Sequence, residues 1–340
     1  MAALTGNAWA EDLRVATFAA PLSRDGPGLL LRDLGRDDPQ IDAVAAIVAQ
    51  VAPDILLLTD VDYDRDGLAL HALADRLEYD HSFALRPNTG MATGLDLDGN
   101  GRVNDARDAQ GYGLFSGDGG MGLLSRWPID AGSMRDLSDL LWRDLPGAVL
   151  PEGPPWSDDV AAVQRLSTTG HWIVPVLAPD GPVQMMAFSA TPPVFDGPED
   201  RNGLRNRDEL RLWRHVLDGA FGPVPEDFVV AGNANLDPAD GDGLRDAMTA
   251  FLADPRLVDP LPRSAGGAAA ADADQTGDPA LDTADWPDGA PGNLRVSYIL
   301  PAATFTVTGR GVFWPAPDDP DAVLADAAGP HRLVWVDLRR

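Results

Sequence analysis

The first 80 residues alternate short apolar runs with amphipathic segments, and this order restricts the fold more than any other feature of the chain. Leu13–Phe18 predicts a strand, and the apolar spacing over Gln40–Val51 predicts a helix. Ile55–Leu58 predicts a buried strand and Leu68–Leu77 a second helix. A strand–helix–strand–helix order is typical of layered α/β folds.

The rest of the chain predicts further strands and helices. Strands are expected at Met121–Ser125, Trp172–Leu177, Val183–Ser189, Phe228–Ala231, Arg295–Leu300, Thr304–Val307 and Arg332–Val336, and helices at Arg205–Leu217 and Leu244–Phe251. Residues 86–120 predict a long loop, and residues 265–292, rich in Ala, Asp, Gly and Pro, predict a flexible surface loop. No internal repeat or change of composition marks a linker. We therefore expect one domain over residues 13–340, after an N-terminal extension of residues 1–12.

The chain is strongly acidic. Its 26 Lys and Arg residues against 53 Asp and Glu residues give a formal net charge of -27. Such a surface repels phosphate backbones and disfavours extended nucleic acid as a partner, unless a local basic groove or bound metals offset it. The same acidity also serves solubility. The absence of cysteine excludes disulfides and Cys-ligated zinc. No apolar run has the length of a membrane span.

The N-terminus leaves two readings of localisation open. Residues 1–6 contain neither a charged region nor an apolar core, so as written they are not a signal peptide and the chain would be cytoplasmic. Ala8-Trp9-Ala10, followed by Glu11, has the small–x–small pattern of a cleavage site. If the start is truncated, this pattern is the remnant of a targeting segment and favours export to the periplasm or the medium. An ordinary terminus is the alternative.

Short polar side chains follow one apolar run. Residues 229–231 lead into Gly232, and Asn233, Asn235 and Asp237 come directly afterwards. Hydrolytic sites of α/β proteins are commonly built from polar groups at a strand end. The segment therefore predicts a site at this point of the sheet.

Several blocks resemble one superfamily in the same order along the chain. These blocks are Arg14–Phe18, Ile55–Asp64, Gly122–Arg126, Thr191–Gly203, Leu294–Pro301 and His331–Asp337. They resemble the endonuclease/exonuclease/phosphatase superfamily, and Thr191–Gly203 is similar to a segment of one bacterial branch. The resemblance implies a four-layer α/β sandwich, with two mixed β-sheets flanked by helices. It also implies metal-dependent phosphoester hydrolysis, in which Mg²⁺ or a similar ion and fixed donors meet developing negative charge.

The chain departs from the family pattern at most polar positions. The substituted positions are Ala19 for Asn, Asp60 for the metal-binding Glu, Gly119 for Tyr, Ser189 for His, Asn233 for the catalytic Asp, Ser297 for Asp and Pro330 for Asp. Asn235 and His331 match the family. An amide has no basic form and alanine cannot bind a metal, so these changes predict a loss of catalysis.

Two functions follow from this pattern. The first is a hydrolase-like protein, catalytically impaired, that binds a small anionic ligand or a protein partner. The alternative is an active metal-dependent phosphoesterase with a rearranged site, in which Asp60 holds the metal, Asn235 binds phosphate and His331 acts as acid or donor. A second carboxylate would then come from Asp62, Asp64 or Asp237.

A second cation site is predicted in the long loop. Asp96, Asp98 and Asn100 place oxygen ligands at alternate positions, as at the start of a calcium loop. Arg107 at the twelfth position excludes a complete EF-hand. A nearby carboxylate would have to replace the usual Glu, and the candidates are Asp105 and Asp108. The alternative is a cluster of turns without Ca²⁺.

Arginines gather near the start of the helix predicted at residues 205–217. Arg201, Asn202 and Arg205 could form an anion-binding pocket there, because a helix N-terminus also favours anions. The alternative is a set of ion pairs with neighbouring carboxylates. His171 begins a predicted strand. One interpretation places its side chain at the rim of a site.

Overall fold

The computed structural model describes residues 12–287 and 291–340, which form two mixed β-sheets. The six-stranded sheet has the order β10-β11-β1-β2-β4-β3. Its strands are β1 Leu13–Phe18, β2 Ile55–Val61, β3 His81–Phe83, β4 Gly120–Ser125, β10 Thr306–Phe313 and β11 Leu333–Arg339. The five-stranded sheet has the order β5-β6-β7-β8-β9. Its strands are β5 Arg135–Asp136, β6 Gly170–Ala178, β7 Gly181–Ser189, β8 Phe228–Asn233 and β9 Ser297–Pro301.

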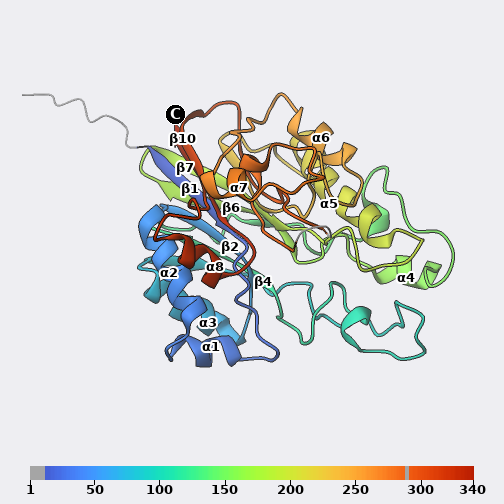
Figure 1. Ribbon diagram of the computed structural model, residues 1–340. Helices are drawn as coiled ribbons and strands as arrows, with labels where there is room; N and C mark the ends of the chain where they lie inside the picture. The colour runs from blue at the N-terminus through green and yellow to red at the C-terminus, as the bar shows by residue number, and fades with distance from the viewer. Residues whose placement is uncertain (1–11, 288–290) are drawn as a thin grey trace, which may run out of the picture.

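Helices lie outside both sheets, which confirms the predicted four-layer α/β sandwich. Figure 1 places α1, α2, α3 and α8 on one side of the strands and α5 and α6 on the other. The helices are α1 Leu29–Leu34, α2 Pro39–Val51, α3 Leu68–Arg76, α4 Asp158–Val163, α5 Arg201–Leu217, α6 Asp246–Leu252, α7 Ala265–Ala269 and α8 Ala322–Ala328. Short 3-10 turns occur at Arg65–Gly67, Ala106–Asp108, Trp142–Asp144 and Pro279–Leu281.

Local sequence explains these elements. Helix α2 begins where the Asp38 side chain accepts hydrogen bonds from the amides of Gln40 and Ile41, with a proline at its first position. In β1, Val15 packs in the core shared with the second sheet, whereas Ala16 and Phe18 pack against the helices. The two faces of β1 thus contribute side chains to two different apolar layers.

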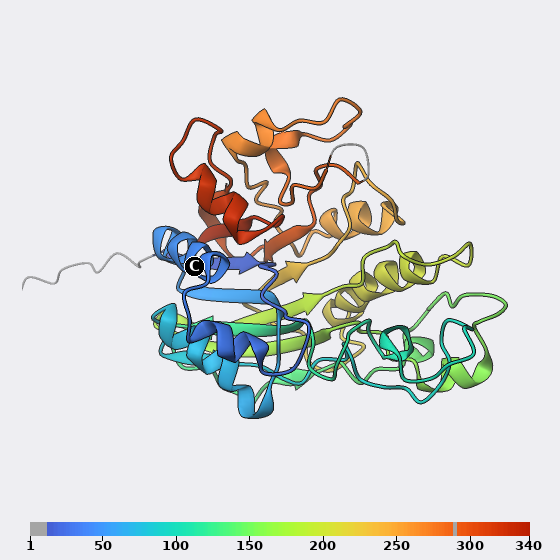
Figure 2. The same cartoon turned by 60° about the horizontal axis from the view of Figure 1, so that its bottom comes forward.

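The strands that carry the predicted site residues end at one edge of the sandwich. β1 pairs with β2 in parallel, and β7 pairs with β8 in parallel. In Figure 2 the arrows of β1, β7 and β8 point to the same side of the molecule. Ligands of open α/β sheets bind beyond the carboxyl ends of the strands, so this edge is where a site is expected.

The segment predicted as a flexible surface loop is folded over its described part. Residues 265–287 contain α7 and one 3-10 turn, and Ala280 and Ala284 are buried. Gly266 packs so closely on Trp314 that an added Cβ would lie 2.1 Å from the indole ring. The small residues of this segment permit close packing. The same residues carry little sequence pattern, so the packing was not predicted. Residues 288–290 lie outside the described part, and the flexibility of the segment stays a prediction.

Of the predicted N-terminal extension, only Asp12 lies among the described residues, where it forms an ion pair with Arg339. Its targeting role stays a prediction. None of the helices in residues 12–287 and 291–340 combines the length and apolar character needed to cross a bilayer.

Candidate active site

Asp60 occupies a β-bulge at the end of β2. The register of β2 against β4 shifts between Thr59 and Val61, and Asp60 has a φ of 63°. Its carbonyl accepts the amides of Leu22 and Ser23, each at 3.0 Å. Bulges re-aim side chains next to functional sites, and a positive φ outside glycine is costly. The backbone is thus held in a strained form at the position that the resemblance assigns to metal binding.

Three carboxylates gather around this bulge. The Ser23 hydroxyl donates to Asp60 Oδ1 at 2.6 Å, and it also interacts with Asp62. Burial raises the pKa of Asp62 to about 6. Burial also raises the pKa of Asp60 and of Asp118, and the charge of Asp118 raises the pKa of both other residues. Among the described residues none of the three forms an ion pair, and Asp62 Oδ1 is buried without a hydrogen-bond partner.

Gly119 explains how this cluster fits together. It has a φ of 57°, and an added Cβ would lie 3.4 Å from Asp60 Oδ1 and 3.6 Å from Ser23 Oγ. The family has Tyr at this position. Because Gly119 has no side chain, the carboxylate of Asp60 lies against its backbone instead of against a phenol. The predicted lost-site position therefore borders the acidic cluster directly.

A row of uncharged side chains crosses the second sheet at the same edge. Ser189 of β7 is the register partner of Asn233 in β8, and Asn233 is the partner of Ser297 in β9. Register partners project from the same face of a sheet. The structure therefore brings together three positions where the family carries His, Asp and Asp, and none of the three side chains ionises near neutral pH.

The amides of this row bind their own backbone. Asn233 Oδ1 accepts the Asn235 amide N–H at 3.1 Å, and Asn235 Nδ2 donates to the Ala190 carbonyl at 2.8 Å. Asn235 has a φ of 50°, a left-handed conformation that Asn tolerates better than most residues. Ser297 Oγ is buried and has no hydrogen-bond partner among the described residues.

His331 lies beside this row and is neutral. Burial, together with the charge of Arg332, lowers its pKa to about 4. Its ring meets Trp286 edge-on, with the ring centroids 5.1 Å apart. Nδ1 is buried and has no partner within the described residues, and Pro330 supplies no carboxylate at the preceding position.

Short contacts connect the row to His331. The hydroxyl of Thr283 accepts the amide of Ser297 at 2.9 Å, and its neighbour Ala284 forms a β-bridge with His331. Gly329, two residues before His331, packs against the loop after β1 that contacts Asp60. An added Cβ on Gly329 would lie 2.7 Å from Pro21, two residues before Ser23. The two sheets thus contribute to one continuous edge.

Two of the three candidates for a second carboxylate are engaged elsewhere. The carboxylate of Asp64 accepts the amide of Ala69 at 3.1 Å near the start of α3. The carboxylate of Asp237 accepts three backbone amides, including that of Arg295 at 2.6 Å. Asp62 is the candidate that retains a free oxygen. Ala19, which the resemblance also counts among the lost positions, is buried beyond β1 and offers only a methyl group.

The predicted calcium loop is partly corrected. Oxygens of Asp96, Asp98 and Asp108 lie within 4.8 Å of one another, so Asp108 supplies the further carboxylate. Asn100 does not join them in the way the sequence suggested, because its Oδ1 accepts the amide of Arg102 and its Nδ2 donates to Asp98. The observed group is an acidic triad whose members also cap the turns of this loop.

The predicted anion pocket is not built from free donors. Arg205 is buried, and its guanidinium donates to four backbone carbonyls. Arg201 donates to Gln164 Oε1, and Asn202 Nδ2 donates to the Val194 carbonyl. Anion binding by these three residues stays a prediction, and their side chains serve internal contacts. His171 is also fully buried, so the reading at a site rim was wrong.

The resemblance is confirmed by comparison with known proteins. A family model described as the Endonuclease/Exonuclease/phosphatase family matches residues 5–330. The chain belongs to this family. No curated protein sequence matches the chain.

Solved structures of the endonuclease/exonuclease/phosphatase family share its fold. An endonuclease/exonuclease/phosphatase from Beutenbergia cavernae DSM 12333 is similar, with a TM-score of 0.58 and 20% identity over 97% of this chain and 72% of that chain. A family protein from Bacteroides vulgatus gives a TM-score of 0.54 with 13% identity over 96% and 98%. Sphingomyelinase C from Streptomyces griseocarneus gives 0.52 with 16% identity over 96% and 99%.

Sequence reasoning missed two members of the site. Ser23 lies in the loop after β1, and Asp118 precedes the glycines that open β4. Because β4 is antiparallel to β2, the start of β4 lies beside the end of β2, and this pairing places Asp118 near Asp60. An acidic residue just before a strand predicted to pair with β2 was the available signal.

Asp60 and Asp62 at the β2 bulge offer carboxylate oxygens to a divalent cation, although the oxygens of Asp60, Asp62 and Asp118 do not all lie within 4.8 Å of one another in the described part of the chain. Asp60, Asp62 and Asp118 are hard oxygen donors, as Mg²⁺, Mn²⁺ and Ca²⁺ require, and Asp62 Oδ1 is an orphaned buried oxygen. Burial is the main cause of the raised pKa values of the three groups, and a bound cation would favour their charged forms. Members of this family commonly use divalent metals, and the identity of the ion at this site belongs to the proposal below.

Proposed function

We propose that this protein is a catalytically impaired member of the endonuclease/exonuclease/phosphatase family that retains a binding role. The observation that carries the proposal is the uncharged row of Ser189, Asn233 and Ser297 across three neighbouring strands. Hydrolysis by the family mechanism needs a group that orients or deprotonates water at the position of Asn233. An amide cannot accept that proton.

His331 does not replace the missing groups. A pKa of about 4 leaves its imidazole neutral at pH 7, so it carries no positive charge for a developing oxyanion. Among residues 12–287 and 291–340, its Nδ1 has no carboxylate partner of the kind that usually fixes the tautomer and orientation of a catalytic histidine. Loss of one preorganised donor typically costs about 10²–10³ in rate, and here several are missing together.

The binding role rests on the acidic cluster of the first sheet. Asp60 and Asp62, with Asp118 nearby, would hold Mg²⁺ or another divalent cation. When bound, such an ion supplies positive charge that attracts an anionic oxygen and polarises it. The Asn235 backbone and side chain hold the end of β8 in place. We infer that the ligand is a small anion, because the net charge of -27 opposes long polyanions.

The loop of Asp96, Asp98 and Asp108 supports a second cation proposal. Three carboxylates within 4.8 Å suit Ca²⁺, which takes oxygen ligands in flexible geometry. An ion here would stabilise the long loop over residues 86–120 and would take no part in chemistry at the strand ends.

One observation favours the alternative, an active phosphoesterase with a rearranged site. Burial raises the pKa of Asp62 to about 6, and a carboxylate with this pKa is a better general base than an ordinary one. In this function Asp60 would bind the metal, and Asp62 would take the role that Asn233 cannot fill.

A combined binding and turnover experiment separates the two functions. Thermal unfolding would be followed in EDTA and then with Mg²⁺, Mn²⁺ or Ca²⁺, and the release of nitrophenolate would be measured from mono- and bis-(p-nitrophenyl) phosphate. The proposal expects stabilisation by a metal, lost in Asp60→Ala, and no metal-dependent turnover. Turnover that requires the metal and disappears in Asp60→Ala would replace the proposal by the alternative.

A further inference from the structure

Helix α5 concentrates positive charge in an otherwise acidic protein. Five arginines lie in its 17 residues, at positions 201, 205, 207, 211 and 214. The first two point into the protein and bind internal carbonyls. Arg207, Arg211 and Arg214 follow one another at helical spacing, so they share one face of α5. The anion site predicted at Arg201, Asn202 and Arg205 stays a prediction, and the outward-facing arginines of α5 lie after it along the helix.

A buried carboxylate holds two of these arginines in place. Asp208 is fully buried, and its Oδ1 accepts Nε and Nη2 of Arg207 and Nη1 of Arg211 at 2.7–3.1 Å. Its Oδ2 accepts Trp142 Nε1 at 2.8 Å and the Val149 amide at 3.1 Å. Asp208 thus holds both guanidiniums in place. Arg211 Nη1 also donates to the Gly147 carbonyl at 2.6 Å, so these contacts leave Nη1 of Arg207 and Nε and Nη2 of Arg211 unused.

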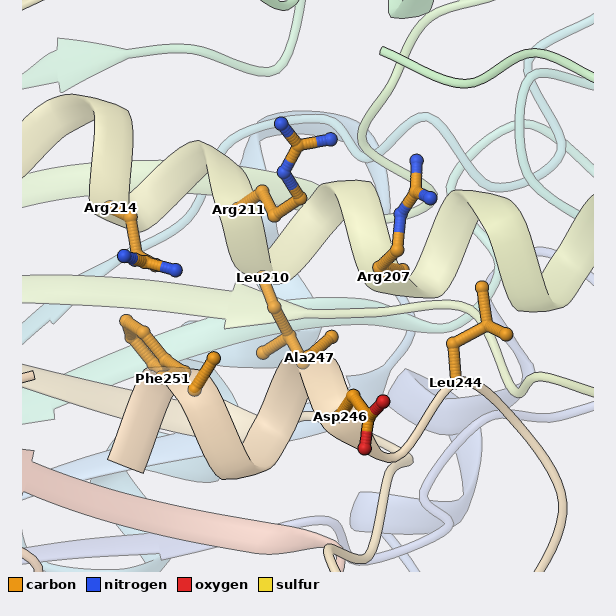
Figure 3. A pocket seen from close by; sticks show the side chains of 9 residues that line it. Arg207, Leu210, Arg211, Arg214, Leu244, Asp246, Ala247 and Phe251 are labelled. Carbon is orange, nitrogen blue, oxygen red and sulfur yellow. The ribbon is translucent and has the colours of Figure 1, made fainter. Parts of the chain in front are cut away.

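Arg214 is different because it is exposed and has no hydrogen bond or ion pair within residues 12–287 and 291–340. Figure 3 shows its guanidinium directed toward Phe251 of α6, whereas the guanidiniums of Arg207 and Arg211 point away from α6. A cation that gains no partner from folding is available to a ligand.

A groove of about 350 Å³ lies between α5 and α6 beneath these arginines. The stems of the three arginines line one wall, and α6 supplies an apolar wall. The remaining lining residues are Leu210, Leu244, Asp246, Ala247, Ala250 and Phe251. Asp246 is the acidic side chain among them. A volume of this size suits a small molecule, since ligand pockets usually begin at about 300 Å³.

We propose that this groove binds a small organic anion, a phosphate or carboxylate group attached to a short apolar body. The anionic group would lie at Arg214, whose guanidinium is directed toward α6, because planar guanidiniums bind carboxylate and phosphate oxygens with two parallel hydrogen bonds. The apolar body would lie over Ala247 and Ala250. A long polyanion is disfavoured, because it would extend beyond the arginines onto a surface of strongly negative net charge.

The site does not depend on the proposed function, because it uses none of the residues at the strand ends. Binding of phenylphosphonate, an apolar anion that cannot be hydrolysed as an ester, would be measured by titration calorimetry in EDTA. EDTA removes divalent cations, so anion capture at the Asp60 cluster does not contribute. Inorganic phosphate and phenol serve as the anionic and the apolar half of the probe, and both should bind more weakly than phenylphosphonate.

Two groove variants and one matched control test the assignment. Arg214→Gln removes an exposed cation that forms no hydrogen bond or ion pair within the described residues, and Ala250→Glu places a carboxylate on the opposite wall. Each should weaken binding by about tenfold or more. Arg310→Gln makes the same charge change at an exposed arginine of β10 and should leave the affinity unchanged. Absence of saturable binding, or equal affinity in Arg214→Gln and the wild type, would overturn the proposal.

Discussion

The two sheets of this sandwich end at the same edge, yet they differ in what they offer a ligand. The end of β2 in the six-stranded sheet keeps three carboxylates, a strained bulge at Asp60 and an orphaned oxygen on Asp62. The end of β7, β8 and β9 in the five-stranded sheet presents Ser189, Asn233 and Ser297, which carry no charge. In the function proposed above, the first sheet retains the metal-binding half of the site, and the second sheet carries a neutral polar row in place of the other half.

This difference separates binding from chemistry. Holding a cation requires oxygens and negative charge, and the first sheet supplies both. Cleaving a phosphoester also requires a proton acceptor and donors fixed on the phosphoryl group, and the second sheet is where the family places them. The comparison predicts that changes in the first sheet alter metal affinity, whereas changes in the second alter turnover or stability.

The largest expected effect comes from restoring a carboxylate to the neutral row. Asn233→Asp should raise metal-dependent hydrolysis of bis-(p-nitrophenyl) phosphate by about 10²-fold, because a positioned base typically contributes this much or more. The measurement is the initial rate with Mg²⁺ or Mn²⁺. Asn233→Ala, which adds no base, is the matched control and should gain nothing. A rate for Asn233→Asp equal to that of the control would show that the missing base is not what separates the two halves.

The second-largest effect is a loss of stability on removing Asn206, whose side chain supports the neutral row. Asn206 Nδ2 donates to the carbonyls of Thr191 and Ala234 at 2.7 and 2.8 Å, and so ties the loops after β7 and β8 to α5. Asn206→Ala leaves two buried carbonyls without this donor and should lower the free energy of unfolding by about 2–3 kcal/mol. Urea titration measures it.

Two further results sharpen this prediction. Asn202→Ala removes a single partly buried bond to Val194 and should cost less than Asn206→Ala, about 1 kcal/mol. The stabilisation that a divalent cation gives through Asp60 should survive in both variants. A cation effect that disappeared in Asn206→Ala would mean that the two halves are coupled more closely than the contacts indicate.

The pH dependence of stability tests the first sheet. The pKa of Asp62 is about 6 in the folded protein and near 3.8 when unfolded, so the folded state binds the proton more tightly. Stability from this group is therefore present below about pH 4 and is lost as the pH rises to about 6. In EDTA, Asp62→Asn should reduce this fall, measured by urea unfolding at several pH values. A pH profile identical to that of the wild type would contradict the burial of this carboxylate.

The smallest expected effect is on the imidazole beside the neutral row. Trp286 packs edge-on against His331 and contributes to the burial that lowers its pKa to about 4. Trp286→Ala should admit water and raise the pKa of His331 toward the ordinary value near 6.5. An NMR titration of the ring protons reports it. If the pKa stayed near 4, the indole would not be the source of the desolvation.

Much of the scaffold could be predicted from the sequence because its signals are local. Apolar runs such as Ile55–Leu58 and the spacing of Gln40–Val51 correspond to β2 and α2. The blocks that carry the resemblance fall on strands of both sheets and on the segments beside them, and the roles of the site residues stay predictions. The structured part of residues 265–287 escaped prediction because Ala and Gly carry little pattern, and its packing on Trp314 is a long-range contact.

Features of the site that depend on pairing were beyond the sequence. Asp118 joins Asp60 because β4 runs antiparallel to β2, and Arg205 is unavailable because four carbonyls surround it. The sequence left open whether Asp105 or Asp108 joins Asp96 and Asp98, and the folding of the loop brings Asp108 to them. Residue type and spacing indicate which chemistry is present, but only the fold decides which groups face one another.

The most direct test is the rate at which the wild-type protein hydrolyses bis-(p-nitrophenyl) phosphate while a divalent cation is bound. Binding would be verified first by a stabilisation that Asp60→Ala abolishes. The account predicts that the metal-loaded wild type releases nitrophenolate no faster than Asp60→Ala does. A metal-dependent rate well above that of Asp60→Ala would show that the neutral row does not prevent catalysis and would contradict the central claim.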